Sequence, residues 1–414
     1  MTIVEKNPPL LSPLMRWFML AMVLANIAGT MSILLMPIYL SEQGASIGQV
    51  GLVFTITSVA ILILQIIGGW VSDSIGRLKA IAIGSVGGII GYIALIIAPT
   101  WQWMIVALII YQIPFALVAP SFNAFIAENS AEENRGRVYG ITGTIYQVTG
   151  VIGPPLGGLI AGSYGYKPML LVAGILYTAA AGLRIWMATT MPSPKEKQSK
   201  PMSMSAFKSS MGLVFGMLFG GGIITWIFIT DGINDIANQL TNNLQPLYME
   251  QVAGITIQQI GLLGAIFSIT MMIVPMFSGK LSDRYGERVP IFFGFLTIFA
   301  ALWIFLSSRN FIGFAVVWAI FGLGVGLLGP AYQALISKVV PAKMLGIFSG
   351  IFYSSVGFIS LAAPWLGAKM WENWGPRSPF FATAIASALV LPIIWIKFKL
   401  PEKSGAALEE STAA

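Results

Sequence analysis

The sequence predicts an all-α membrane protein with twelve transmembrane helices in two pseudo-symmetric six-helix bundles. Hydrophobic residues make up 56% of the 414 residues and charged residues only 9%, whereas soluble proteins carry about 25% charged residues. Apolar runs long enough to cross the ~30 Å hydrocarbon core as helices recur along the whole chain. The second half of the sequence also repeats the first at an offset of 210 residues.

The apolar runs give the expected spans in order. They are residues 14–40, 47–71, 79–98, 101–127, 138–162, 168–190, 211–248, 255–279, 289–307, 311–336, 344–370 and 378–398. The seventh is too long for one helix, and Gly220-Gly221-Gly222 predicts a break within it. The polar stretch before the first span has no small-residue cleavage site, so we expect it to be retained.

The spans divide the chain into an N-terminal bundle (1–190), a cytoplasmic linker (191–210), a C-terminal bundle (211–400) and a disordered cytoplasmic tail (401–414). Eighteen of the 23 basic residues fall on the side of the membrane that holds both termini. The positive-inside rule therefore predicts cytoplasmic termini in a cell membrane protein. This orientation accounts for the net charge of +7 without a nucleic-acid partner.

The repeat keeps one register through five segments. The matched pairs, first half with second, are Ile47 with Ile257, Gln49 with Gln259, Gly51 with Gly261, Gly69 with Gly279, Ser72 with Ser282, Asp73 with Asp283, Gly76 with Gly286, Pro120 with Pro330, Gly140 with Gly350, Pro154 with Pro364 and Gly157 with Gly367. Pro37 and Tyr39 match Pro246 and Tyr248 at an offset of 209. Parallel six-helix halves imply a pseudo-twofold axis along the membrane normal, with a binding site between them near the midplane.

The segment from Gly69 to Lys79, after the second span, resembles the loop signature of the major facilitator superfamily, and residues 279–289 repeat it. The resemblance implies that the glycines (Gly69, Gly279) allow close contact between the halves, that the carboxylates (Asp73, Asp283) face a helix N-terminus, and that Arg77 pairs with Glu128. The alternative for either copy is a helix-ending glycine (Gly76 or Gly286) with solvated charges in a tight loop. In the second copy Glu287 replaces the arginine, so we do not expect the same ion pair there.

The fifth span resembles the antiporter signature of that family. The matching residues are Gly140, Gly153, Pro154, Gly157 and Gly158. The resemblance implies export rather than uptake, whereas ordinary packing of small residues between helices is the alternative. Leu108 stands where many proton-coupled exporters carry a membrane arginine, so a proton acceptor must lie elsewhere.

Ionisable residues inside spans are costly and mark candidate sites. Asp231 and Asp235 are spaced i, i+4 in the seventh span, and the repeat aligns Asp235 with Asn26 in the middle of the first span. In a low-dielectric cavity, two adjacent carboxylates raise each other's proton affinity, so we expect them to couple protons to transport. Arg184 lies near the cytoplasmic end of its span, and we expect its side chain to extend to the lipid headgroups.

Polar and aromatic residues at similar depth are candidates for the lining of a substrate cavity. They are Asn26, Gln112, Tyr146, Gln147, Trp226, Asn234, Asn238, Tyr332, Gln333 and Tyr353. For each of them, a structural hydrogen bond between helices is the alternative.

Three functions are compatible with these patterns. The first is a monomeric, proton-coupled exporter of amphipathic or cationic small molecules, which needs no cofactor besides a proton gradient. The second is uptake or facilitated diffusion of a small polar solute such as a sugar. The third, a non-transporting sensor or membrane enzyme, is disfavoured because the chain has no His or Cys and shows no nucleophile and base pair.

Overall fold

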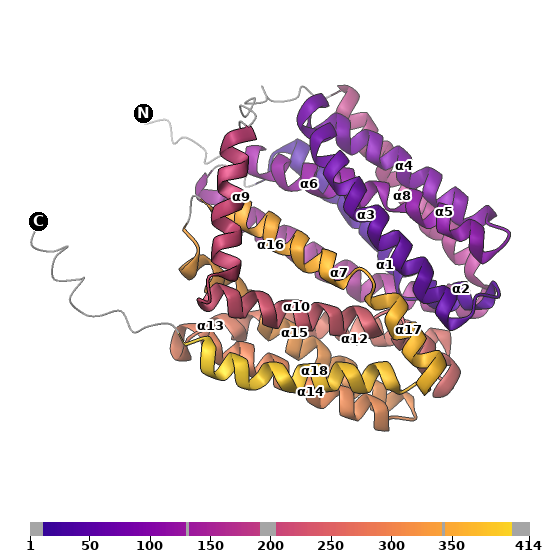
Figure 1. Ribbon diagram of the computed structural model, residues 1–414. Helices are drawn as coiled ribbons and strands as arrows, with labels where there is room; N and C mark the ends of the chain where they lie inside the picture. The colour runs from indigo at the N-terminus through magenta and orange to yellow at the C-terminus, as the bar shows by residue number, and fades with distance from the viewer. Residues whose placement is uncertain (1–10, 130–131, 191–203, 342–343, 400–414) are drawn as a thin grey trace, which may run out of the picture.

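The computed structural model describes residues 11–129, 132–190, 204–341 and 344–399, and every regular element in these ranges is helical (Figure 1). The predicted tail lies outside the described residues, as does most of the predicted linker. Helix α9 already begins at Met204, inside that linker.

The first half of the chain forms eight helices. They are α1 (Pro13–Ile33), α2 (Met36–Glu42), α3 (Ile47–Ile75), α4 (Arg77–Ile97), α5 (Trp101–Tyr111), α6 (Ile113–Asn129), α7 (Glu132–Tyr164) and α8 (Tyr166–Thr190). Within this half α8 packs against α1 and α4, and α6 packs against α3 and α4.

The second half is built in the same order. Its helices are α9 (Met204–Phe219), α10 (Ile223–Thr241), α11 (Gln245–Leu247), the π-helix η1 (Tyr248–Val252), α12 (Ile257–Ile273), α13 (Pro275–Tyr285), α14 (Arg288–Ser307), α15 (Phe311–Val339), α16 (Leu345–Ser360), α17 (Ala363–Trp374) and α18 (Ser378–Lys397). Here α18 packs against α10 and α14, and α15 packs against α12 and α14.

Several predicted spans are divided by short breaks at prolines. Pro37, Pro275 and Pro364 each stand in the first turn of a new helix, where proline's missing N–H costs no hydrogen bond. The repeat explains a further break, because Pro246 stands in the first turn of α11 just as Pro37 stands in the first turn of α2. Pro154 and Pro155, in contrast, lie inside the continuous helix α7.

The seventh span is broken where its three glycines predict. Helix α9 ends at Phe219, α10 begins at Ile223, and the two helices meet at 83°. Gly221 has a φ of +79°, a conformation that residues with a Cβ rarely adopt. Figure 1 shows α9 standing upright beside α16 and across the end of α10.

Within the described residues, ten helices or consecutive helix pairs are long and apolar enough to span a membrane, and the bent α9–α10 pair is an eleventh. The remaining predicted span corresponds to α7, which is 33 residues long but rich in Gly, Thr and Pro. Large apolar side chains such as Ile63, Ile90 and Ile385 remain more than half or about half exposed, as expected of a surface that faces lipid.

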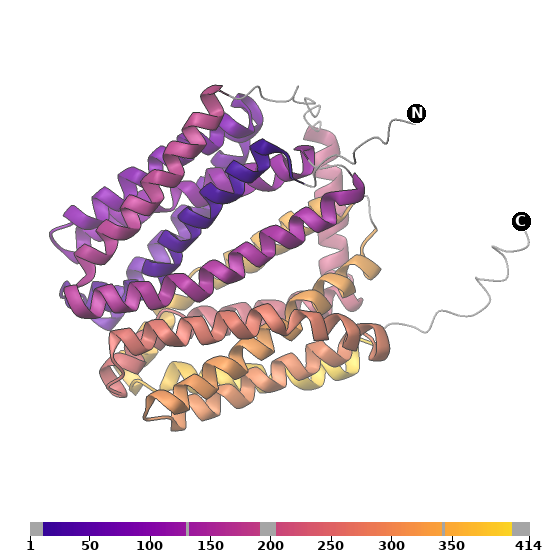
Figure 2. The same ribbon diagram turned by 180° about the vertical axis from the view of Figure 1, so that it is seen from behind.

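The two halves meet along two helix pairs, α3 with α17 and α7 with α12, which we call the seams. Both seams lie at the end of the molecule where α2 and α17 meet, on the right of Figure 1 and the left of Figure 2. Helix α1 begins and α18 ends at the opposite end.

The seams are related by the sequence repeat. A methyl group added to Gly51 of α3 would lie 2.6 Å from the Pro364 carbonyl oxygen, and one on Gly261 of α12 would meet the backbone at Pro154 and Gly158. Pro364 and Pro154 are a matched pair of the repeat, as are Gly51 and Gly261. The repeated glycines therefore bring the backbones of the two halves into contact in an equivalent way on both sides.

Candidate substrate cavities and gates

A cavity of about 210 Å³ opens within the first half, among α1, α4, α5, α6, α7 and α8. Its polar lining includes Asn26 and Tyr146, two of the residues expected from the sequence, together with Tyr92, Tyr177 and Arg184. Most of the remaining lining is apolar. Concave, mostly apolar sites with a few polar groups are the usual form of small-molecule sites.

Arg184 is the charged residue of this cavity, and the expectation that it reaches the headgroups is wrong. Its side chain is only 6% exposed, and its Nη1 donates a 3.2 Å hydrogen bond to Ser85 Oγ on α4. Tyr177 lies two turns earlier on the same face of α8, and its ring occupies space that Gly88 leaves free. Packing between α4 and α8 therefore holds the guanidinium inside the bundle.

A second cavity, of about 270 Å³, lies within the other half among α10, α14, α15 and α16. It is lined by six of the residues singled out by the sequence: Asp231, Asn234, Asn238, Tyr332, Gln333 and Tyr353. The hydroxyl-bearing rings of Tyr332 and Tyr353 line the cavity together with Asp231. None of the described residues that line this cavity is basic.

Asp235 lies one turn after Asp231 on α10 but does not line this cavity. Its Oδ2 accepts a hydrogen bond from Ser360 Oγ, at the end of α16. Ser360 is 2% exposed, so Asp235 is tied to the break between α16 and α17. The two aspartates therefore have different surroundings, one in the cavity and one between helices.

Three other expected lining residues belong to neither cavity. Gln112 occupies the break between α5 and α6, and Gln147 lies on α7 outside the first cavity. The Trp226 ring is stacked under Lys397, whose Nζ lies 5.0 Å from the ring centroid. Trp226 therefore contacts a cation of the chain itself.

The loop signature is described only in part. The side chains of Asp73 and Glu128 lie outside the described residues, so the expected pair between Arg77 and Glu128 cannot be placed. Arg77 Nη1 donates a 2.9 Å hydrogen bond to Ser72 Oγ. Gly76 and Gly286 have φ values of +97° and +80° and turn the chain between helices in both copies. Asp283 is exposed in the last turn of α13.

An ion pair occupies the second copy, where we expected none. Glu287, 5% exposed, accepts a hydrogen bond from Lys338 Nζ in the last turn of α15. The repeat aligns Glu287 with Arg77 and Lys338 with Glu128. The second half thus places an ion pair at this position with the signs of the charges reversed.

The repeated glycines fall into two groups. Gly51, Gly157, Gly261 and Gly367 face backbone of another helix so closely that a methyl group would collide. At Gly69, Gly140, Gly279 and Gly350 an added methyl would meet no described atom within 4 Å. The close contact expected at Gly69 and Gly279 is therefore not made in this conformation. The packed group lies toward the seam end and the unpacked group toward the opposite end.

The antiporter-like segment forms the junction of three helices. Gly153 and Gly157 lie against Thr30 and Met31 of α1, whereas Pro154 and Gly158 lie against α12. Gly367 packs against Leu240 in the same way that Gly157 packs against Met31. The contact that Gly157 makes in the first half is thus made by its repeat partner, Gly367, in the second half.

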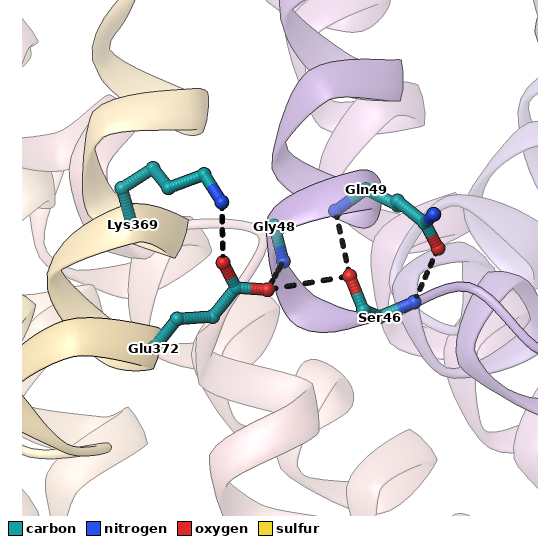
Figure 3. A network of polar contacts seen from close by, with 5 residues as sticks. All are labelled: Ser46, Gly48, Gln49, Lys369 and Glu372. Carbon is teal, nitrogen blue, oxygen red and sulfur yellow. Dashed lines mark hydrogen bonds and ion pairs between the residues drawn. The ribbon is translucent and has the colours of Figure 1, made fainter.

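A network of polar contacts closes the α3–α17 seam (Figure 3). Glu372 Oε1 accepts hydrogen bonds from the Gly48 N–H (2.7 Å) and from Ser46 Oγ (3.2 Å), and Oε2 accepts one from Lys369 Nζ (2.6 Å). Ser46 and Gln49 form a capping box that satisfies their own N–H groups at the start of α3, and the Glu372 carboxylate accepts the hydrogen bond of the Gly48 N–H between them. We call these four residues, Ser46, Gly48, Lys369 and Glu372, the latch.

Sequence reasoning missed the latch, as it missed Lys338 and the role of Arg184. A hint of the latch was present in Gln49 and Gln259, because a repeated glutamine three residues after Ser46 or Thr256 is the mark of two capping boxes. Nothing in the sequence brings Glu372 to one of them.

A family model described as Major Facilitator Superfamily matches residues 18–231 and 227–413. A multidrug resistance efflux pump PmrA homolog of Lactococcus lactis is 25% identical over 87% of this chain and 88% of its own length. The multidrug resistance protein MdtG of Proteus mirabilis is 27% identical, over 89% and 91%. The crystal structure of the nucleoside transporter NupG superposes with a TM-score of 0.74 at 15% identity, covering 94% of this chain and all of that one.

Proposed function

Because the chain belongs to the Major Facilitator Superfamily and is a secondary transporter, we propose that it exports amphipathic or cationic small molecules in exchange for protons. The two efflux relatives, at about a quarter identity, support export. In this proposal the protein acts as a monomer by alternating access, with both termini in the cytoplasm.

The observation that carries the proposal is the division of the repeated glycines. Gly51 and Gly261 are in backbone contact across the seams, whereas Gly69, Gly140, Gly279 and Gly350, toward the other end, meet no described atom. Small residues on helices favour close approach. We therefore assign this conformation to a state that is closed at the latch and open at the opposite, cytoplasmic end, and we expect the unpacked glycines to meet in the alternate state.

Asp231 is the residue we assign to exchange. It lines a cavity in which no described residue supplies a positive charge, so its carboxylate can be neutralised by a proton or by a cationic substrate. Because the two compete for one carboxylate, a proton entering from outside releases the substrate, and substrate arriving from the cytoplasm releases the proton. Asp235 adds a second negative charge one turn away.

The test is transport of ethidium, a lipophilic cation, in proteoliposomes with an imposed pH gradient. We expect the gradient to drive flux in the wild type and Asp231→Asn to abolish that dependence. Asp235→Asn should retain part of it, because its carboxylate is bonded to Ser360 and not exposed to the cavity. Gradient-driven flux that survives both substitutions unchanged would refute proton exchange at these residues.

A further inference from the structure

The cavity of the first half has a chemistry opposite to that of the second. Seventeen described residues line it, and Arg184 is the one charged residue among them. The guanidinium forms no ion pair with any described Asp or Glu. The hydroxyls of Tyr177 and Tyr146, which line the same cavity, are uncharged groups at neutral pH. A buried cation without a counter-ion carries a large desolvation cost.

The donors around this cation are incompletely used. Among the described residues, Arg184 Nε is buried without a hydrogen-bond partner, and the Tyr177 hydroxyl has no well-aligned partner either. Ser85 Oγ accepts a hydrogen bond from Arg184 Nη1 and donates one to the Ile81 carbonyl oxygen at 2.7 Å. Because the serine is held in this way, it fixes the position of the guanidinium. Arg184 and Tyr177 both line this cavity, and each carries a donor that has no hydrogen-bond partner among the described residues.

We infer that this cavity is a subsite for a carboxylate carried on an aromatic or aliphatic substrate. A carboxylate accepts hydrogen bonds from guanidinium and hydroxyl donors at once and supplies the missing counter-charge. Tyr92, Tyr111 and Phe122 provide apolar faces for the rest of the molecule. The inference rests on the proposed function and refines it: the exported compounds include molecules that carry a carboxylate.

Binding to the purified full-length protein tests the subsite, by calorimetry at neutral pH in a dilute HEPES buffer that contains neither chloride nor a carboxylate. The probes are 1-naphthoate and neutral 1-naphthamide, which share one ring system and differ in charge. We expect naphthoate to bind at least about tenfold more tightly, a difference of about 1.4 kcal/mol. Arg184→Gln should remove this preference, and Arg184→Lys should keep part of it because the charge remains.

Lys397→Gln is the matched control, because Lys397 is a cation that contacts Trp226 outside this cavity, and it should leave the preference intact. Equal affinity of the two probes for the wild type, or a preference that survives Arg184→Gln, overturns the inference. If Arg184→Gln does not fold, Tyr177→Phe decides: it removes one donor, keeps the ring, and should weaken naphthoate binding but not naphthamide binding.

Displacement of naphthoate by about 150 mM chloride in the wild type would instead identify an inorganic-anion site and also overturn the inference. The binding measurement uses no pH gradient, so its outcome is separate from that of the ethidium assay. If the pH gradient drives no ethidium flux in the wild type but the preference for naphthoate is intact, proton exchange alone is refuted. If the gradient drives flux but the wild type shows no preference for naphthoate, the carboxylate subsite alone is refuted.

Discussion

Glu287 and Lys338 form an ion pair at the positions where the other half of the chain carries Arg77 and Glu128. The pair joins the residue before α14 to the last turn of α15. Exchange of the two charges preserves the attraction between these elements, because an ion pair depends on opposite signs and not on which side carries which. The second half therefore forms an ion pair at positions where the first half carries two residues of opposite charge in the reverse order.

Reversing this pair in two steps should first break and then restore it. Glu287→Arg places two positive charges together and should lower the free energy of unfolding by about 1–2 kcal/mol, between the values for exposed and buried pairs. The double variant Glu287→Arg/Lys338→Glu should recover most of that loss. Thermal unfolding of the purified protein in detergent measures both.

Arg284→Gln serves as the control, because Arg284 is an exposed cation in the last turn of α13 whose guanidinium lies over Tyr285. It should change stability little. A double variant no more stable than Glu287→Arg would show that the pair contributes nothing as a pair.

The latch should set how often the seam end opens. Glu372→Ala removes an acceptor that holds the Gly48 N–H, Ser46 and Lys369 together, and charge-assisted hydrogen bonds contribute roughly 1.5–3 kcal/mol each. We expect the population open at this end to rise at least about tenfold. Glu372→Gln keeps one acceptor oxygen for Gly48 and should give a smaller rise.

Spin labels at positions 42 and 373 measure this opening by double electron–electron resonance, because Glu42 and Asn373 are exposed residues at the ends of α2 and α17. The chain has no Cys, so introduced cysteines are its sole thiols. Identical distance distributions in the wild type and Glu372→Ala would exclude a gating role for the latch.

The break in the seventh span depends on one glycine conformation. Gly221→Ala forces a Cβ onto a residue with φ of +79° and should cost about 1 kcal/mol of stability. Gly222→Ala is the matched control, because Gly222 has a φ of −79° and open space for a methyl group, and it should be neutral. Equal thermal stability of the two variants would contradict the assigned strain.

The architecture followed from the sequence because hydropathy and the repeat are properties of many residues. Single side chains were harder to place. Asp231 and Asp235 are one turn apart, and hydropathy treats them alike, yet the structure puts one in a cavity and ties the other to Ser360. The face of α10 that lines the cavity is set by the packing of α14, α15 and α16 around α10. The spacing of residues along one helix does not determine that packing.

The placement of the Arg184 side chain could not be predicted from the sequence either. A guanidinium near a helix end can extend to the headgroups or remain within the bundle, and helix geometry permits both. Ser85 and Gly88 on α4 decide between these, since one accepts its hydrogen bond and the other makes room for Tyr177. They lie about a hundred residues away, and no motif links them to Arg184.

Alanine substitutions at two glycines of one helix should affect opposite conformations. A methyl group on Gly158 of α7 would lie 2.8 Å from the Ile257 carbonyl oxygen across the seam, and overpacking of this kind costs about 1–3 kcal/mol. Gly158→Ala should therefore lengthen the distance between labels at positions 42 and 373. Gly140→Ala meets no described atom within 4 Å and should leave that distance unchanged.

Labels at positions 137 and 285, at the other end of the molecule, should report the reverse. There Gly158→Ala is expected to shorten the distance, because the protein shifts to the state closed at that end. Gly140→Ala is expected to prevent that closure, so ethidium flux falls although the conformation described here is undisturbed. If Gly140→Ala transports at the wild-type rate, the unpacked glycines do not come together in the transport cycle, and the assignment of two alternating closures loses its basis.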